Sequence, residues 1–310
     1  MPTTRAASKP SARLQREKVR FRSGKDSCAA WHYQGDNGAV VVMAGGFAVP
    51  KEPGTDRYAV AFQAAGFSVL AFDYRRIGES EGQPRQVVRI RDQLADWDAA
   101  IECAAGLPGV DPAKVAAWAF SLSGGLILEV AARHPELGAV VAQTPVVDGG
   151  AATRNAARHQ TAGALLRFTG IALRDALGSL VGRPPRLVPL AAPRGTVAVL
   201  TTPDALEGDR ALVTVDGPAD WPAVVAARSA LRIGTYRPGR VARRIQCPLL
   251  VVACEGDQSA LAAPAVKVAS RAPRAELVML PGGHYAPFLD AYDDALAAEI
   301  GFLRTHVLEG

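Results

Sequence analysis

Short apolar runs recur along this chain, separated by longer stretches in which apolar residues repeat at helical spacing. The runs are rich in Val, Ala and Leu and comprise AVVVMA (39–44), SVLAFDY (68–74), VAAWAF (115–120), GAVVAQ (138–143), PLLVVACEG (248–256) and AELVMLPGG (275–283). Continuous apolar runs of this length are typical of strands that are buried on both faces of a parallel sheet.

The stretches between these runs predict helices. They are DRYAVAFQAAG (56–66), QVVRIRDQLADWDAAIECAAG (86–106), GGLILEVAARH (124–134), PAVKVASRA (264–272) and DDALAAEIGFLRTHV (293–307). Strands that alternate with helices form βαβ units. Ahead of them, KVRFRS and CAAWHYQ predict an antiparallel pair at one edge. We therefore predict an α/β fold with a doubly wound, mostly parallel sheet.

Residues 149–242 interrupt this alternation. They contain the helical QTAGALLRFTGIALRDALGSL, the Pro-rich GRPPRLVPLAAPRG, the strand-like TVAVL and the helix-like WPAVVAARSALRIG. Nearly a hundred residues is too long for a structureless loop in a compact domain. We predict an inserted lid between the two core segments 19–148 and 243–310.

The formal net charge of +5 is unevenly distributed. The first 22 residues hold seven cations and one anion, which leaves a net charge of −1 for the rest of the chain. Because the body has no basic stripe interleaved with aromatic residues, we expect no nucleic-acid partner. The Ser, Pro, Ala and Arg composition of residues 1–18 predicts a disordered basic tail.

Targeting segments and metal motifs are absent from the sequence. No apolar segment of a signal peptide follows the N-terminal charges and no window holds 18 uninterrupted apolar residues, so we expect a cytoplasmic protein without a membrane span. No two cysteines form C-x-x-C and none lies near a histidine at metal-ligand spacing; they are Cys28, Cys103, Cys247 and Cys254. We expect reduced core thiols, no metal and no organic cofactor.

The stretch AWAFSLSGG joins a predicted strand to a predicted helix. A nucleophile elbow at such a turn holds a strained serine above the sheet, and the residues two before and two after it must be small. Ser121 would be flanked by Ala119 and Ser123, and Ser123 by Ser121 and Gly125, so both serines fit. Phe120 suits a strand end, which slightly favours Ser121 and makes Ser123 a candidate N-cap. A helix-capping turn without catalysis is the alternative.

A serine nucleophile needs a base, and the base needs an orienting carboxylate. His284 follows the strand-like AELVML in the turn PGGH, at a carboxyl strand end where open α/β sheets bind ligands. His32 lies in an edge strand, His134 at a helix end, His159 in the lid and His306 in the last helix. His284 is therefore the candidate base, with a loop-anchoring role as the alternative.

The candidate acid is Asp257, which follows PLLVVACEG at the same carboxyl edge. The chain order Ser, Asp, His is one that hydrolytic triads use. Glu255 and Asp148 are rival acids. Asp73 also ends a strand, but we expect it to organise a turn with one of the arginines that follow it.

The oxyanion of acyl attack needs two preorganised N–H donors. The amide of Leu122, directly after Ser121, is one candidate. The second is the amide of Phe47 in AGGFAVPKE, where Gly45 and Gly46 let the backbone turn inward. An ordinary glycine turn is the alternative.

Five motifs carry a family resemblance: AGGFAVPKE, FDYRRIGESEGQPRQ, WAFSLSGG, EGDQSALAAP and LPGGHYAPF. Taken in order, they make the chain resemble the α/β-hydrolase superfamily. More narrowly, it is similar to the dienelactone-hydrolase-like and prolyl-peptidase-like serine esterases, which include polyketide thiohydrolases and acyltransferases. The resemblance covers residues 20–148 and 243–308, and the lid only weakly. It implies Ser121 as nucleophile, Asp257 as acid and His284 as base.

The elbow pattern of that family, W-G-x-S-x-(G/S)-G-G, corresponds to WAFSLSGG and selects Ser121 over Ser123. Two positions depart from the family. Gly45 stands where a histidine is usual, which would loosen the oxyanion loop or open space for a bulky substrate. Ala119 replaces the first elbow glycine and adds a methyl group at a crowded position.

We therefore predict a serine hydrolase that cleaves a small-molecule ester or thioester through an acyl-enzyme. An apolar stripe in the lid suggests a hydrophobic acyl group, with lid-to-body packing as the alternative; it consists of Leu165, Leu166, Phe168, Ile171 and Leu173. Candidate substrate contacts are Tyr285, Phe168 and Leu165. The rival functions are an acyltransferase or cyclase of polyketide-type metabolism and a non-catalytic binding protein. The sequence leaves monomer and dimer open.

Overall fold

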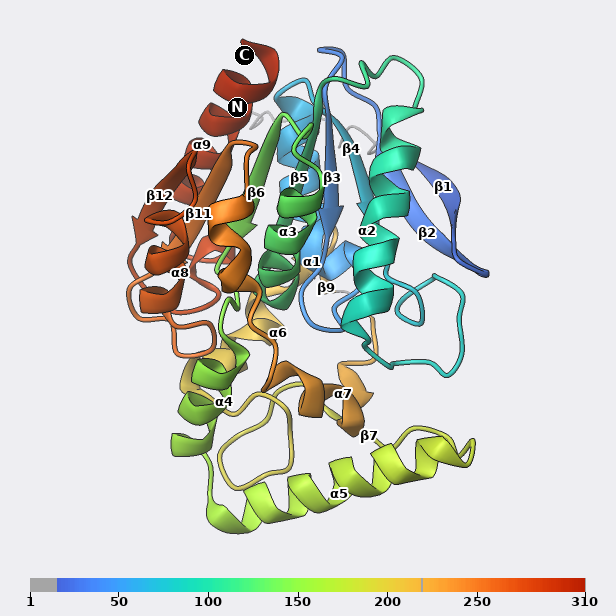
Figure 1. Cartoon of the computed structure of the whole chain (residues 1–310), viewed down its shortest axis with the longest axis vertical. Helices are drawn as coiled ribbons and strands as arrows, with labels where there is room; N and C mark the ends of the chain where they lie inside the picture. The colour runs from blue at the N-terminus through green and yellow to red at the C-terminus, as the bar shows by residue number, and fades with distance from the viewer. Residues whose placement is uncertain (1–15, 219, 310) are drawn as a thin grey trace, which may run out of the picture.

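The computed structural model describes residues 16–218 and 220–309 and is built around one eight-stranded sheet (Figure 1). The strands are, in spatial order, β1 (Arg16–Ser23), β2 (Asp26–Tyr33), β4 (Ser68–Phe72), β3 (Val40–Ala44), β5 (Val115–Phe120), β6 (Ala139–Gln143), β11 (Leu249–Cys254) and β12 (Ala275–Leu280). β2 pairs antiparallel with β1 and β4, whereas all pairs from β4 to β12 are parallel. The predicted α/β fold with a mostly parallel sheet is confirmed.

Helices cover both faces of this sheet (Figure 1). One face carries α2 (Ile90–Ala105), α3 (Ser121–Arg133) and α8 (Ala262–Ala269), and the other carries α1 (Lys51–Ala64) and α9 (Tyr292–Leu303), which continues into a π-helical turn (Arg304–Leu308). The side chains of β3 alternate between two apolar clusters: Val40 and Val42 join one, Val41 and Met43 the other. This alternation explains why β3 is apolar at every position.

The N-terminal boundary of the core differs from the prediction. Residues 1–15 of the predicted tail lie outside the described residues, but residues 16–18 belong to β1. Arg16 Nη1 donates to Tyr33 Oη at 3.0 Å and to Asp56 Oδ1 at 2.8 Å. These bonds, added to the β1–β2 ladder, hold the start of the strand on the body.

The lid elements lie between β6 and β11 in the chain, and most of them lie beyond the carboxyl ends of the strands (lower part of Figure 1). The short segment 213–218 packs beside α1 instead. They are α4 (Gly149–Arg158), α5 (Ala162–Leu180), β7 (Leu187–Pro189), η1 (Pro203–Glu207), α6 (Gly208–Ala211), β8 (Val213–Thr214), β9 (Gly217–Pro218), β10 (Val224–Ala226), α7 (Ala227–Ile233) and η2 (Pro238–Arg244). The lid limits of 149–242 stay a prediction. Within the described part of the chain, no helix has the length and apolarity needed to cross a membrane.

Two lid predictions were wrong. The segment TVAVL forms no strand, because only Leu200 makes a bridge, to Ala191. The helix predicted over WPAVVAARSALRIG begins only at α7, since its first part pairs with β7 as β10. Both segments are short and apolar, and tertiary pairing decides such cases.

Candidate active site

Ser121 occupies a sharp turn between β5 and α3. Its φ is +60°, a left-handed conformation that residues other than glycine rarely adopt. The preceding Phe120 is extended, with φ −120° and ψ 160°, so the chain reverses within one residue and α3 begins at Ser121 itself. The half-buried Ser121 side chain then projects at the carboxyl edge of the sheet, as a nucleophile elbow requires.

His284 and Asp257 meet Ser121 at this edge. His284 Nε2 lies 2.9 Å from Ser121 Oγ, and His284 Nδ1 lies 2.8 Å from Asp257 Oδ2. Asp257 Oδ1 accepts from the backbone amides of Ser259 and Ala260 at 2.9 and 2.6 Å. The structure thus brings together the three side chains that the sequence singled out, at hydrogen-bond distances along one line.

The electrostatic surroundings of His284 favour its protonated form. Burial alone lowers the pKa of the imidazole, but the charge and hydrogen bond of Asp257 and the charge of Asp204 together raise the pKa above its usual value. The side chains of His284 and Asp257 are each only 1% exposed. An imidazolium that forms during a reaction would therefore be stabilised by two carboxylates without help from solvent.

Sequence reasoning missed Asp204, which comes from η1 of the lid. Its Oδ2 accepts from the backbone amides of Gln258 at 2.7 Å and His284 at 3.3 Å, and its Oδ1 accepts from Ser259 Oγ at 2.9 Å. Burial raises the pKa of Asp204, but the charge of His284 and the amide of Gln258 outweigh this and lower it overall. The sequence Thr-Pro-Asp marks the start of a short helix but does not indicate a contact 80 residues away.

Ser123 does not act as the predicted N-cap, because α3 begins two residues earlier. It is 1% exposed, and its Oγ donates to Gly45 O at 2.5 Å and accepts from Tyr74 Oη at 2.9 Å. Tyr74 Oη in turn accepts from Trp97 Nε1 at 2.8 Å. Ser123 therefore ties the helix after Ser121 to the loop that follows β3.

That loop carries the proposed oxyanion donor Phe47. A Cβ added at Gly46 would lie 2.9 Å from the Phe120 ring, so only glycine lets the loop approach the elbow this closely. A Cβ at Gly45 would lie 2.5 Å from Val49 O, so this loop has no room for the side chain expected there from the family pattern. The amides of Phe47 and Leu122 as an oxyanion hole remain a proposal; both residues line the cavity beside Ser121.

Asp73 anchors the far end of the same loop. It accepts from the backbone amide of Lys51 at 2.7 Å and from Lys51 Nζ at 3.0 Å, with both side chains buried. The prediction that Asp73 pairs with a following arginine was wrong, because Arg75 binds Asp96 and Arg76 binds Asp92 instead. The buried pair fixes the first residue of α1, immediately after the loop.

The rival acids have other surroundings. Asp148 caps α4 by accepting from the Ala151 amide at 2.9 Å, and it pairs with Arg237 at 2.9 Å. Glu255 is exposed. Among residues 16–218 and 220–309, no group of three or more histidine, cysteine or acidic side chains could hold a metal ion.

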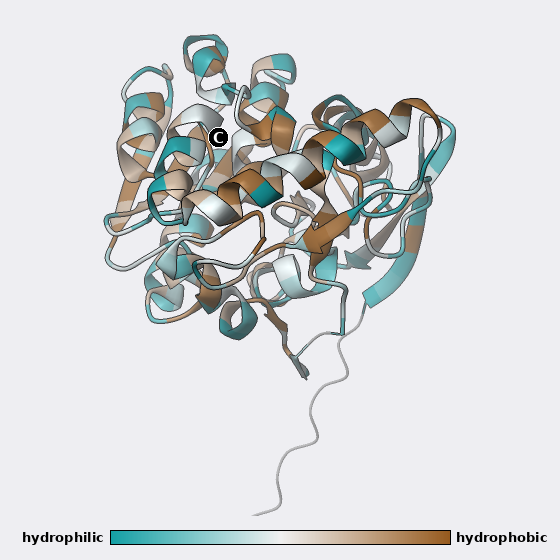
Figure 2. Cartoon of the chain, turned by 90° about the horizontal axis from the view of Figure 1, so that it is seen from below, coloured by the Kyte–Doolittle hydropathy of each residue, from teal (hydrophilic) through white to brown (hydrophobic). Residues whose placement is uncertain are grey.

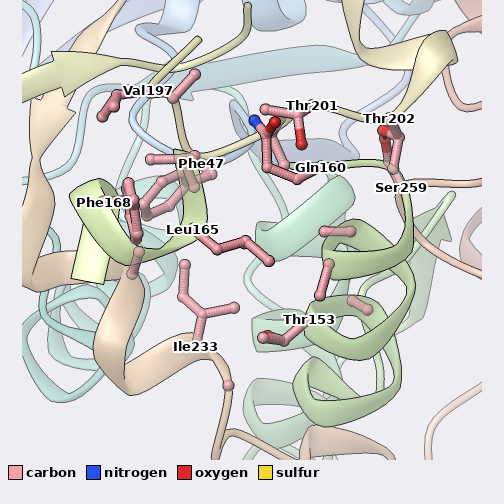
Figure 3. A pocket seen from close by; sticks show the side chains of 18 of the residues that line it. Phe47, Thr153, Gln160, Leu165, Phe168, Val197, Thr201, Thr202, Ile233 and Ser259 are labelled. Carbon is pink, nitrogen blue, oxygen red and sulfur yellow. Dashed lines mark hydrogen bonds between the residues drawn. The ribbon is translucent and has the colours of Figure 1, made fainter. Parts of the chain in front are cut away.

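An apolar cavity of about 320 Å³ opens beside Ser121 (Figure 3). The residues labelled in Figure 3 all line it; they are Phe47, Thr153, Gln160, Leu165, Phe168, Val197, Thr201, Thr202, Ile233 and Ser259. Leu165 and Phe168 come from α5, so the structure brings two of the three predicted contact residues to this cavity.

A second, smaller cavity of about 80 Å³ shares Phe47 and Ser121 with the first. Tyr285, the third predicted contact residue, lines it together with Trp221 and Asp209. Ser121 therefore lies where two cavities meet, one bounded mainly by α4, α5 and the segment 196–202, and the other by the segment 205–223 and the turn after His284.

Comparisons with known proteins agree with this geometry. The model of the alpha/beta hydrolase family matches residues 40–299. The quorum-quenching protein AidA of Acinetobacter baumannii is 37% identical over 290 residues, which cover 92% of this chain and 93% of AidA. The thiohydrolase aneE of Aspergillus aculeatus is 37% identical over 112 residues, which cover only 36% of this chain and 35% of aneE.

A solved structure shows the same fold. GrgF from Penicillium superimposes with a TM-score of 0.79 at 23% identity, over 95% of this chain and 99% of GrgF. In sequence, GrgF, named a polyketide transferase, is 28% identical over 160 residues, about half of each chain. The resemblance predicted from the motifs is confirmed, and this chain is an enzyme of the hydrolase class that belongs to the alpha/beta hydrolase family.

Proposed function

We propose that this enzyme is a serine hydrolase that cleaves an ester or thioester through an acyl-enzyme on Ser121. The observation that carries the proposal is the continuous line of contacts from Ser121 Oγ through the His284 ring to Asp257, at 2.9 and 2.8 Å. A serine hydroxyl becomes a competent nucleophile when a base accepts its proton and a carboxylate holds that base in the right tautomer.

In this mechanism, Asp257 accepts the Nδ1–H of neutral His284, which leaves the Nε2 lone pair toward Ser121. Ser121 Oγ attacks the carbonyl carbon as Nε2 takes its proton, and the amides of Phe47 and Leu122 donate to the oxyanion. The imidazolium then gives the proton to the leaving alkoxide or thiolate. Water repeats the sequence on the acyl-enzyme, releasing the acid and restoring Ser121.

The acyl group is proposed to occupy the cavity of about 320 Å³. Its walls include apolar side chains such as Leu165, Phe168 and Ile233, with a few hydroxyl and amide groups, among them Gln160. A cavity of this size suits a small organic molecule, and its apolar surface favours an acyl chain over a charged one. The smaller cavity beside Tyr285 would receive the leaving group.

Acyl transfer is the second candidate. It is favoured by the relatives named polyketide transferases and by the smaller cavity, which could hold an organic acceptor in place of water. The triad chemistry is the same in both cases. The two reactions differ only in which nucleophile resolves the acyl-enzyme.

The test is the hydrolysis of p-nitrophenyl esters and matched thioesters with apolar acyl chains of increasing length. We expect kcat/KM to rise with chain length until the larger cavity is filled, and Ser121→Ala to lower it by about 10⁴-fold or more. Ser270→Ala, which removes an exposed serine just after α8, is the control and should keep the full activity. Full activity in Ser121→Ala would overturn the proposal. Adding alcohol, thiol or amine acceptors and finding mainly the transfer product would select the second candidate.

A further inference from the structure

Helix α5 of the lid carries apolar residues on two opposite faces. Its inner side packs on the body, where Phe168 and Ile171 contact the main core cluster. The apolar stripe predicted for the lid therefore divides in two. Leu165 and Phe168 line the cavity beside Ser121, whereas Leu166 and Leu173 lie exposed on the outside.

Four leucines form what we call the outer stripe of α5. They follow one another at intervals of seven, four and three residues, which places them on one side of the helix. They are Leu166, Leu173, Leu177 and Leu180, exposed by 74, 51, 65 and 81%. Figure 2 looks onto α5 and shows hydrophobic positions along most of its length. Single exposed leucines are ordinary, but an aligned row marks a binding surface.

The charge around this stripe has one sign. Residues 149–203 contain seven arginines and one acidic residue, a net charge of +6. The acidic residue, Asp175, is buried and lies 3.3 Å from Arg228 Nη1. Arg167 and Arg174 are exposed on one flank of the stripe, and neither has an ion-pair partner among the described residues. The rest of the chain after residue 22 has a net charge of only −1, so this local excess of positive charge does not show in the total.

We propose that the outer stripe of α5 docks on an anionic lipid surface. The leucines would enter the boundary between headgroups and acyl chains, and Arg167 and Arg174 would face the lipid phosphates. Exposed leucines beside arginines are the pattern of helices that lie in the plane of a membrane. Anionic lipids also attract each nearby cation with about 1 kcal/mol.

A second copy of the chain fits this face less well. A symmetric pair of α5 helices would bring the same arginines close to one another. Because residues 149–203 hold no exposed carboxylate, nothing in this segment could neutralise them. The charge therefore favours an anionic partner, and the apolar row favours lipid over a nucleic acid.

The test is flotation of the full-length protein with vesicles of phosphatidylglycerol and phosphatidylcholine, and with pure phosphatidylcholine vesicles. We expect binding to the anionic vesicles only, lost at about 1 M salt, where charges are screened beyond about 3 Å. Arg167→Glu/Arg174→Glu and Leu173→Ser/Leu177→Ser should each weaken binding by about 10- to 100-fold. The matched controls change exposed residues on α8 and just after it: Lys267→Glu/Arg271→Glu and Val266→Ser should bind as the wild type does.

Three results would overturn the inference. The first is that the wild type does not bind anionic vesicles, and the second is that the α5 variants bind them as well as the wild type does. The third is that the wild type sediments as a dimer without lipid and that Leu173→Ser/Leu177→Ser is a monomer. Circular dichroism and thermal unfolding would show that each variant is folded. Ser121→Ala should float with the wild type, so failure of the proposed chemistry and failure of this inference are distinguishable.

Discussion

The carboxyl edge of the sheet that carries Ser121, His284 and Asp257, called the triad edge here, differs from the outer stripe of α5 in which side chains are buried. Polar groups are buried at the triad edge, whereas apolar groups are exposed on the outer stripe. At the triad edge, His284, Asp257 and Asp204 are buried, and each has at least two hydrogen-bonding partners. On α5, the leucines of the outer stripe lie in solvent. Arg167 and Arg174 beside them are exposed and form no ion pair with the described residues, and Arg167 donates only to backbone carbonyls. Buried groups with several partners have one geometry, so changing them costs activity or stability. Exposed groups contribute little to folding, so a conspicuous pattern among them suggests an external partner.

The largest effect should come from removing the base at the triad edge. His284→Ala is expected to lower kcat/KM for an ester substrate by about 10⁴-fold or more, because Ser121 loses its proton acceptor. His306→Ala removes a histidine that is paired with Glu276 on the surface and should leave kcat/KM unchanged. Equal rates for wild type and His284→Ala would contradict the mechanism.

Asp204 tests whether the lid takes part in the buried network. Asp204→Asn should lower kcat/KM by about 10- to 100-fold, because the loops that carry Asp257 and His284 both lose an anchor. The charge of Asp204 raises the pKa of His284, and the base must be neutral to act. Removing that charge should therefore move the acid limb of the pH profile of kcat/KM to lower pH.

The control for this variant is Asp216→Asn, which neutralises an exposed acid in the β8–β9 turn of the same lid. It should leave both the rate and the pH profile unchanged. If Asp204→Asn unfolds at the same temperature as the wild type and its pH profile of kcat/KM keeps the same acid limb, Asp204 has no effect on the pKa of His284. Its role would then be limited to the structure of the lid.

Glu299 is a buried carboxyl group with only one hydrogen-bonding partner, unlike the buried groups at the triad edge, which have several. Trp118 Nε1 donates to its Oε2 at 2.9 Å, and its Oε1 has no partner. Burial raises the pKa of Glu299 well above its usual value, and the hydrogen bond from Trp118 offsets this only in part. The folded chain then keeps a proton that the unfolded chain releases above about pH 4. The contribution of Glu299 to stability is therefore present below that pH and is lost as the pH rises.

Glu299→Gln keeps the acceptor for Trp118 but cannot ionise. Relative to the wild type, it should gain about 1–3 kcal/mol of unfolding free energy as the pH rises from about 5 to about 8. Urea unfolding at both pH values measures this difference. Glu102→Gln, an exposed site on α2, should show no such gain. If the difference in unfolding free energy between Glu299→Gln and the wild type is the same at both pH values, Glu299 is ionised in the folded protein.

The smallest effect should come from the outer stripe. Leu177→Ser is expected to change the unfolding free energy by less than about 0.5 kcal/mol, because this side chain is already in solvent. Phe168→Ala, on the opposite side of α5, should cost about 1–3 kcal/mol, since it packs on the core. Thermal unfolding of the two variants compares the two faces directly, and a large loss in Leu177→Ser would show that the stripe is part of the fold.

The two regions also differ in how far the sequence predicted them. Alternating apolar runs and helical patterns predicted the sheet and its helices. This was possible because a strand buried on both faces is recognisable from its own few residues, all of them apolar. The elbow, His284 and Asp257 could be found because each follows a strand at its carboxyl end. Their mutual distances then follow from the order of the strands.

Other contacts could not be predicted because they join distant segments. Ser123 was expected to cap a helix, but its partners are Gly45 and Tyr74 on other strands' loops. Asp204 reaches His284 from the lid, where pairing is irregular and short segments take their structure from their neighbours. The outer stripe was visible as leucines, but only the fold shows which of them face away from the body.

The most direct test of the central claim is to identify the residue that a fluorophosphonate modifies. The folded protein is treated with the probe, digested, and its peptides are analysed by mass spectrometry. We predict one adduct, on Ser121, that is absent from Ser121→Ala and retained by Ser123→Ala, because only Ser121 contacts His284 Nε2. An adduct on Ser123, or no adduct on folded wild-type protein, would contradict the assignment of Ser121 as the nucleophile.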